Sequence, residues 1–185
     1  MRPKPAWPGR GAVRRRLSEI LRVDHAGELG AVHIYRGQRA VFAAAPAHGR
    51  TEEALAEMEA HEQVHLDRFD ALLNAHKVRP TLMAPLWRVA GFALGAGTAL
   101  LGEKAAHACT EAVENVIEQH YAGQIEELKT RDPELAAELS QFRDDELGHR
   151  DRAIEEGARE APGYALLSAV ITAGCKASIK ISEKV

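Results

Sequence analysis

Two stretches with one pattern, Glu62-Gln63-Val64-His65 and Glu146-Leu147-Gly148-His149, decide the fold of this chain. Residues three positions apart lie on the same side of an α-helix, so each stretch directs a carboxylate and an imidazole toward one point. A lone glutamate precedes each stretch by about thirty residues, Glu28 before the first and Glu114 before the second. Four carboxylates and two imidazoles in this order are typical of four-helix bundles that bind two metal ions.

The spacing of these residues predicts two helical hairpins. Residues at one height of an antiparallel helix pair are nearly equidistant from the turn, and Glu28 and Glu62 are 34 positions apart. Their turn should therefore fall near residue 45, where residues 45–49 read Ala-Pro-Ala-His-Gly. Glu114 and Glu146 are 32 positions apart, which places a second turn near residue 130. The offsets between the halves, 86 and 84 residues, indicate two similar hairpins about a pseudo-twofold axis.

Apolar residues with helical spacing surround each of these glutamates and histidines. On the second expected helix, apolar residues between Leu55 and Leu73 form a stripe, and Glu62 and His65 fill its gap. The other three helices repeat the pattern, so the six side chains should point into the core. Four buried carboxylates without partners would repel one another, and two divalent metal ions remove that penalty. Oxygen and imidazole ligands suit iron or manganese.

Composition favours an all-α chain with one domain. The 185 residues are rich in Ala, Leu, Glu and Arg and show no strand alternation. Residues 1–16 contain six basic residues and no acidic one, and we expect them to form a flexible arm able to touch anionic lipid. Residues 17–185 are then the single domain. The net charge of -3, with basic and acidic residues interspersed, argues against a nucleic-acid partner.

Cysteine usage points to a reducing compartment. Cys109 and Cys175 are isolated and lie in apolar surroundings, which indicates small buried side chains and neither a disulfide framework nor a thiolate metal centre.

Two apolar segments lie outside the four expected ligand helices. Residues 82–102 contain one charge, Arg88, and the uncharged run within them is too short to span a bilayer. This segment is either a crossover helix covering one end of the bundle or an apolar surface that lies on a membrane or admits a greasy substrate. Residues 164–181 form a second apolar helix with regularly spaced lysines, which can lie in a membrane interface or pack on a neighbouring subunit.

Several motifs together resemble the demethoxyubiquinone hydroxylase family of ubiquinone biosynthesis, over nearly the whole chain from about Leu17 onward. The stretches that carry the resemblance are Arg22–Ala31, Gly97–Gly102, Cys109–Glu114, His120-Tyr121, Phe142–His149 and Ala173–Lys176.

The resemblance implies a ferritin-like di-iron monooxygenase, peripherally bound to a membrane. Such an enzyme would hydroxylate the ring of a demethoxy polyprenyl benzoquinol with O2 as co-substrate and NADH as reductant. Carried onto this sequence, the iron ligands and catalytic residues are Glu28, Glu62, His65, Glu114, Glu146 and His149. The resemblance further implies Glu62 and Glu114 as bridges between the two irons.

Further residues are assigned by their position near the ligands. Asp24 and Asp145 are expected to orient metal-bound imidazoles, as carboxylates commonly do. His120 and Tyr121 resemble the family's His-Tyr pair near the quinone and are expected to bind substrate. The other histidines out of phase with the ligand stripe are expected at the surface: His33, His48, His61, His76 and His107.

The alternative function is an iron-binding or storage protein of the ferritin type, which would use the same six ligands without quinone chemistry. Its hollow assembly needs a polar exterior, which the two apolar segments disfavour. The absence of an obvious presequence favours the cytoplasmic face of a bacterial inner membrane, with the matrix side of the mitochondrial inner membrane as the alternative. A homo-oligomer and a lipid-delivering partner protein both remain open.

Overall fold

The computed structural model describes residues 10–44 and 48–185, and these residues form helices without any strand. The elements in chain order are α1 (Arg10–Phe42), α2 (Gly49–His76), α3 (Ala84–Leu100), α4 (Glu103–Leu128), α5 (Pro133–Glu155), the short 3-10 helix η2 (Ala158–Glu160) and α6 (Tyr164–Ser182). The predicted all-α class is therefore confirmed for the described residues.

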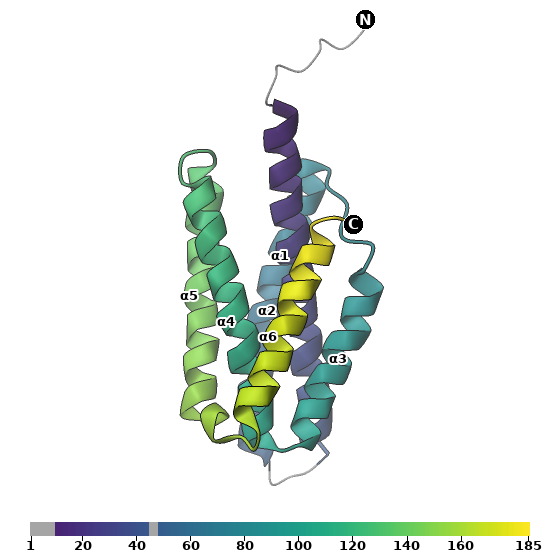
Figure 1. The fold of residues 1–185 in the computed structure, drawn as a ribbon, viewed down its shortest axis with the longest axis vertical. Helices are drawn as coiled ribbons and strands as arrows, with labels where there is room; N and C mark the ends of the chain where they lie inside the picture. Colours follow the sequence, from purple (N-terminus) through teal and green to yellow (C-terminus); the bar gives the residue numbers. More distant parts are fainter. Residues whose placement is uncertain (1–9, 45–47) are drawn as a thin grey trace, which may run out of the picture.

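Four of the helices form the expected bundle of two hairpins. α1 packs antiparallel to α2, and α4 packs antiparallel to α5 (Figure 1). Both turns fall where the spacing placed them, between α1 and α2 and at residues 129–132, although residues 45–47 lie outside the described residues. The second turn has a local cause: the Asp132 side chain accepts a hydrogen bond from the backbone N–H of Leu135, and Pro133 follows in the first turn of α5.

The core consists of two apolar clusters, one on each side of the band that holds the predicted ligands. Toward the beginning of α1 lies a cluster that includes Leu21, Phe69 and Leu139. Toward the end of α1 lies a second cluster that includes Tyr35 and Leu55. The ligand positions of α1 and α2 fall between these clusters in sequence, so apolar packing closes the band above and below.

The start of the domain differs from the expected boundary. α1 already begins at Arg10, so the later part of the predicted arm is helical, whereas residues 1–9 lie outside the described residues. Arg16 explains the difference, because its Nε lies 3.0 Å from Oε2 of Glu127 on α4. Arg14, Arg15 and Arg16 thus continue the first helix, and Arg16 contacts α4.

α3 is a crossover helix, but it does not cover one end of the bundle as the first of the two interpretations held. It runs parallel to α1 along the length of the bundle (Figure 1). Glycines permit this close approach: a Cβ atom built on Gly95 would lie 2.0 Å from the carbonyl oxygen of Ile34, and one on Gly91 would lie 2.8 Å from that of Gly30. Only residues without a side chain allow the two backbones to pack at this distance.

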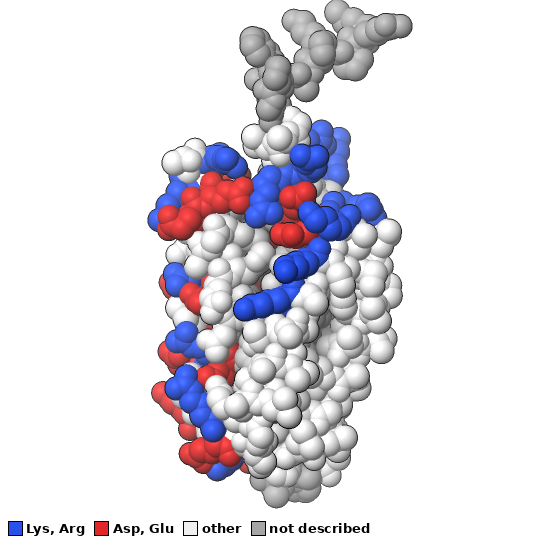
Figure 2. Space-filling model, in the orientation of Figure 1, with Lys and Arg blue, Asp and Glu red and all other residues white. Residues whose placement is uncertain are grey.

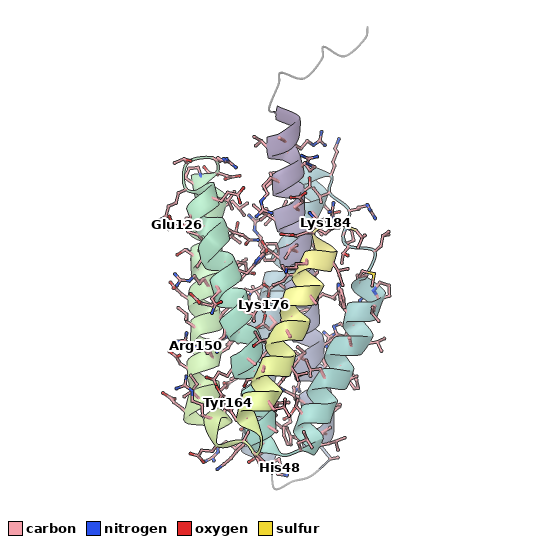
Figure 3. The ribbon with its side chains drawn as sticks, in the orientation of Figure 1. His48, Glu126, Arg150, Tyr164, Lys176 and Lys184 are labelled. Carbon is pink, nitrogen blue, oxygen red and sulfur yellow. The ribbon has the colours of Figure 1, made fainter. Side chains whose placement is uncertain are left out.

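α6 returns along α4 and α1, opposite in direction to α3 (Figure 1). Together α3 and α6 present a broad uncharged face, while the charged side chains gather over α4 and α5 and at the upper end (Figure 2). Lys176 and Lys184 mark the polar margin of α6, and Tyr164 marks its beginning (Figure 3). Among the described helices, α6 is the one long and apolar enough to cross a membrane by length and composition.

The close contact between α1 and α3 can be tested with two glycines of one helix. Gly95→Ala should lower the free energy of unfolding by about 1–3 kcal/mol, because its methyl group would overlap the α1 backbone. Gly97 is exposed on the same helix with nothing near its Cβ position, so Gly97→Ala should be neutral or stabilising by up to about 1 kcal/mol. Urea unfolding followed by circular dichroism measures both variants, and equal stabilities would contradict the contact.

Candidate metal centre

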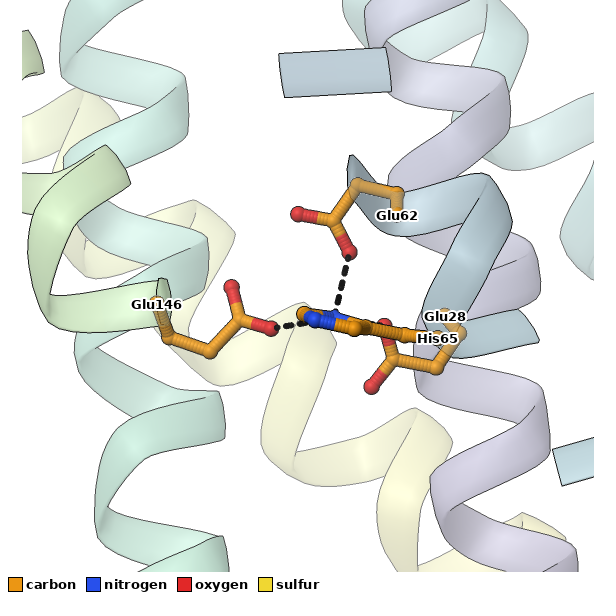
Figure 4. Close-up of side chains that lie close together, drawn as sticks. All are labelled: Glu28, Glu62, His65 and Glu146. Atoms are coloured by element: carbon orange, nitrogen blue, oxygen red, sulfur yellow. Dashed lines mark ion pairs between the residues drawn. The ribbon is translucent and has the colours of Figure 1, made fainter. Parts of the chain in front are cut away.

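The six predicted ligands converge in the middle of the bundle. α1 supplies Glu28, α4 supplies Glu114, α2 supplies Glu62 and His65, and α5 supplies Glu146 and His149. Each of these residues is buried, and their exposed fractions run from 0% for Glu62 and Glu146 to 6% for His149. Figure 4 shows His65 between the carboxylates of three different helices.

The six side chains form two overlapping groups, each able to hold a metal ion. One group is Glu28, Glu62, His65 and Glu146, and the other is Glu62, Glu114, Glu146 and His149. Within each group the candidate ligand atoms lie within 4.8 Å of one another. The carboxylates common to both groups are Glu62 and Glu146. Glu62 and Glu146 therefore have ligand atoms close to those of both groups, whereas Glu114, which the resemblance implied as a bridge, belongs to one group.

Both histidines direct Nδ1 toward the shared carboxylates. Nδ1 of His149 lies 3.0 Å from Oε1 of Glu62, and Nδ1 of His65 lies 3.3 Å from Oε1 of Glu146. Neither contact has hydrogen-bond geometry, and both nitrogens are buried without a hydrogen-bond partner. The same holds for both side-chain oxygens of Glu62 and Glu146 and for Oε2 of Glu28 and Glu114.

These unpartnered atoms test whether the residues fit a metal pair. Buried polar atoms in native proteins are normally hydrogen-bonded, because an unpaired one costs about 1–3 kcal/mol. Here such atoms come from all six ligand candidates and face a common interior. Carboxylate oxygens and imidazole nitrogens are the donors that iron and manganese prefer. The residues present therefore fit a pair of such ions.

Burial and mutual repulsion shift the protonation of this cluster. Burial, followed by the nearby carboxylate of Glu146, holds the pKa of Glu62 and of Glu114 well above the usual range. Burial acts in the same direction on Glu146, but the facing imidazoles of His149 and His65 lower its pKa to about 2. Burial opposes the charge on His65, yet the carboxylates of Glu146 and Glu28 raise its pKa to about 10. Without a cation, the interior therefore retains protons.

Two buried tyrosines hold the lone glutamates. Tyr35 donates a hydrogen bond from its hydroxyl to Oε1 of Glu114 at 2.8 Å, and Tyr121 donates one to Oε1 of Glu28. Each bond satisfies one carboxylate oxygen and leaves Oε2 facing the centre. Tyr35 lies two helical turns after Glu28 on α1, and nothing in the sequence assigned it this role. Tyr121, expected near substrate, contacts a ligand candidate directly.

The residues before the two paired glutamates contact the histidines. Oδ2 of Asp145 lies 3.1 Å from Nε2 of His65, which is the position expected for an orienting carboxylate. Asp24 does not contact a ligand histidine, since its Oδ1 accepts a hydrogen bond from Nε2 of Gln124 at 2.7 Å. His61 contacts Nε2 of His149 through its own Nδ1 at 3.2 Å, a contact that sequence reasoning missed.

One of the five histidines expected at the surface is not there. His107 is 2% exposed, because it follows the buried face at the start of α4, so this expectation was wrong. His61 and His76 are exposed, and His33 and His48 are half-buried.

An apolar cavity of about 390 Å³ lies between α1, α3, α4 and α6. Its walls include Gly27, Val113, Ile117 and Cys175, so it adjoins the residues next to Glu28 and Glu114 in sequence. Most small-molecule sites have volumes of roughly 300–1,000 Å³ and mainly apolar walls.

A second, smaller cavity lies next to this space and includes one ligand candidate, Glu28, in its walls. It has a volume of about 20 Å³ and is lined by Glu28, Tyr121 and His120, and it shares Gly27, Ile117 and Ile179 with the large cavity. The predicted substrate residues His120 and Tyr121 therefore line the small cavity beside Glu28.

The chain is similar in sequence to proteins of a known family. A family model described as "Ubiquinone biosynthesis protein COQ7" matches residues 15–182. A mouse protein named "NADPH-dependent 3-demethoxyubiquinone 3-hydroxylase, mitochondrial" is 50% identical over 177 residues, which cover 92% of this chain and 79% of the relative. The "3-demethoxyubiquinol 3-hydroxylase" of Rhodospirillum rubrum is 49% identical over 178 residues, covering 96% and 82%. The yeast "5-demethoxyubiquinone hydroxylase, mitochondrial" (Saccharomyces cerevisiae) is 40% identical over 184 residues, covering 91% and 78%.

Metal loading should release protons from this centre. In the metal-free protein the pKa of about 10 keeps His65 protonated at neutral pH, and the raised pKa values of Glu62 and Glu114 favour their protonated forms. Ligation requires such protons to leave. Anaerobic addition of Fe(II) to weakly buffered protein should therefore acidify the solution, and metal affinity should fall as the pH is lowered. An indicator dye measures the release. Glu62→Gln, which has no proton to give at that position, should release fewer protons, and loading without acidification would contradict the protonation scheme.

Proposed function

This chain belongs to the family described as ubiquinone biosynthesis protein COQ7, and we propose that it hydroxylates the ring of a demethoxy polyprenyl benzoquinol with O2. The observation that carries this proposal is the juxtaposition of a six-residue metal centre with an apolar cavity of suitable size. In the reaction, one oxygen atom of O2 replaces a ring hydrogen with a hydroxyl group. The other oxygen atom leaves as water, which takes up two electrons from a reductant and two protons.

The two groups of ligands would hold two iron ions. Glu62 and Glu146, which belong to both groups, would contribute to both positions, while Glu28 with His65 and Glu114 with His149 would complete one position each. When bound, the iron pair supplies electrons to O2 and makes it reactive toward an electron-rich ring. Tyr121 and Tyr35 hold the lone glutamates through hydrogen bonds, which fixes the side of the centre nearest the cavity.

The large apolar cavity is the site proposed for the quinol and the adjoining part of its polyprenyl chain. Its walls are almost entirely apolar, which favours an uncharged ring and an isoprenoid over a polar metabolite. His120 and Tyr121 line the narrow space between this cavity and Glu28, so the ring would meet polar groups only at that end. A storage protein has no use for such a cavity, and the observation favours the hydroxylase over the storage alternative.

The uncharged face of α3 and α6 supports a membrane as the source of this substrate. Large apolar side chains are strongly exposed there: Leu86, Val89, Phe92 and Leu100 on α3, and Leu166 and Val170 on α6. An exposed apolar patch bordered by lysines is typical of proteins that lie on a lipid surface. Because α3 and α6 also line the cavity, a quinol could enter from the bilayer without crossing water.

The reductant we propose is a reduced nicotinamide. The resemblance implied NADH, whereas the name of the mouse relative specifies NADPH, so both belong in the assay.

Loss of one shared carboxylate should abolish the reaction. Glu146→Ala removes a ligand from both metal positions, so product formation should fall by more than the roughly 10–100-fold typical of losing a group that only supports a ligand. The assay supplies a demethoxyquinol, labelled O2 and either nicotinamide, and mass spectrometry measures label in the product. Glu126→Ala, at an exposed position of the same bundle, serves as the control. Retained turnover in a helical Glu146→Ala protein would remove the site assignment.

The cavity and the lipid surface can be tested in one vesicle experiment. The protein should float with anionic vesicles, and alkylation of Cys175 in the floated fraction should slow when the vesicles contain the demethoxyquinone, because Cys175 lines the cavity. Burial raises the pKa of this thiol to about 11, so long labelling times are needed. Cys175→Ala identifies any label on other groups. Protein that does not float with the vesicles would refute the membrane proposal. A rate of Cys175 labelling that the quinone does not change would refute the cavity assignment.

A further inference from the structure

The two ligand motifs are alike, but the residues that immediately precede them are not. His61 precedes Glu62 on α2, and Asp145 precedes Glu146 on α5. Each of these residues reaches across to the other hairpin and contacts the histidine of the other motif. Nδ1 of His61 lies 3.2 Å from Nε2 of His149, and Oδ2 of Asp145 lies 3.1 Å from Nε2 of His65.

Both contacts occupy corresponding positions of the pseudo-twofold arrangement. In each case the ring nitrogen contacted is Nε2, while Nδ1 faces the shared carboxylates. Nε2–H can therefore donate to the outer partner and leave the lone pair of Nδ1 for a metal ion. His61 and Asp145 are both exposed, so each partner lies at the surface between α2 and α5.

The two partners differ in chemistry. A carboxylate that accepts the N–H of a metal-bound imidazole fixes the ring and makes it a stronger base toward the metal. A neutral imidazole also accepts this N–H, but it carries no charge and increases the electron density of the ring less. His65 has the carboxylate partner and His149 has the imidazole partner. The centre is symmetric in its six ligands and asymmetric in the partners of its two histidines.

We infer that His61 is a positioning residue that makes the two metal positions unequal, so that the ion beside His149 is held more weakly than the ion beside His65. This inference rests on the proposed metal centre and adds a difference between its halves. The position beside His149 would then be the last to fill and the first to lose its ion.

Stepwise removal of iron from anaerobically loaded full-length protein tests the inference. A chelator titration of the wild type should show two steps, with midpoints separated by about 10-fold or more. His61→Asp gives both histidines a carboxylate partner and should merge the steps. His61→Ala removes the partner and should move the weaker step by a further 10–100-fold or so, with the tighter step unchanged. His61→Gln retains an acceptor and should restore the wild-type separation.

Mössbauer spectra of the same samples provide a second measurement. The wild type should show two iron signals of equal area, and the signals should approach each other in His61→Asp. His76→Asp is the matched control, because His76 is an exposed histidine at the end of the same helix and should leave both measurements unchanged.

The outcomes separate this inference from the proposed function. Two bound ions that leave in one step, or a separation that His61→Asp does not alter, would overturn the role of His61 and leave the metal centre standing. A wild-type protein that binds fewer than two ions would overturn both.

Discussion

The constraint on which this molecule depends is the burial of four carboxylates and two imidazoles in one small volume. Each of the six residues is at most 6% exposed, and apolar clusters close the volume on both sides. An unpaired buried charge costs several kcal/mol, so such a group of residues persists only if protons or cations offset its charge. The raised pKa values of Glu62 and Glu114 correspond to protons that offset the charge when no metal is bound. Two bound metal ions would offset it in place of those protons.

Most of the fold could be predicted because its signals are local. Helical periodicity and the equal distances of Glu28 and Glu62 from a breaker specify a hairpin without knowledge of the rest of the chain. Contacts between the two hairpins leave no comparable pattern in the sequence. The phase of His61 on its own helix points away from the core, and only the path of α5 brings His149 within 3.2 Å of it. The membership of Glu146 in both groups of candidate ligands has the same origin, because it depends on how the two hairpins dock.

For the apolar segments, prediction from the sequence was limited for a different reason. The run at residues 82–102 was open to interpretation as a crossover helix or an apolar surface, and composition specifies neither the direction of a helix nor its neighbour. In the structure Gly91 and Gly95 face α1 at Gly30 and Ile34, where a side chain would overlap the α1 backbone. α3 therefore lies along the bundle, where it can share a cavity with α6 instead of closing one end.

These contacts divide the bundle into two sides. α2 and α5 supply both histidines and both shared carboxylates. Their outer surface is polar, and His61 and Asp145 lie on it where the two helices meet. α1 and α4 supply one glutamate each and have α3 and α6 packed on their outer side. The large apolar cavity lies on this side, and Glu28 lines the small cavity next to it. A substrate that enters from the apolar side would reach the centre at Glu28 and Tyr121, whereas the residues that adjust the histidines lie on the opposite side. Because of this separation, substitutions at His61 and Asp145 would change the properties of the metal ions without altering the substrate site.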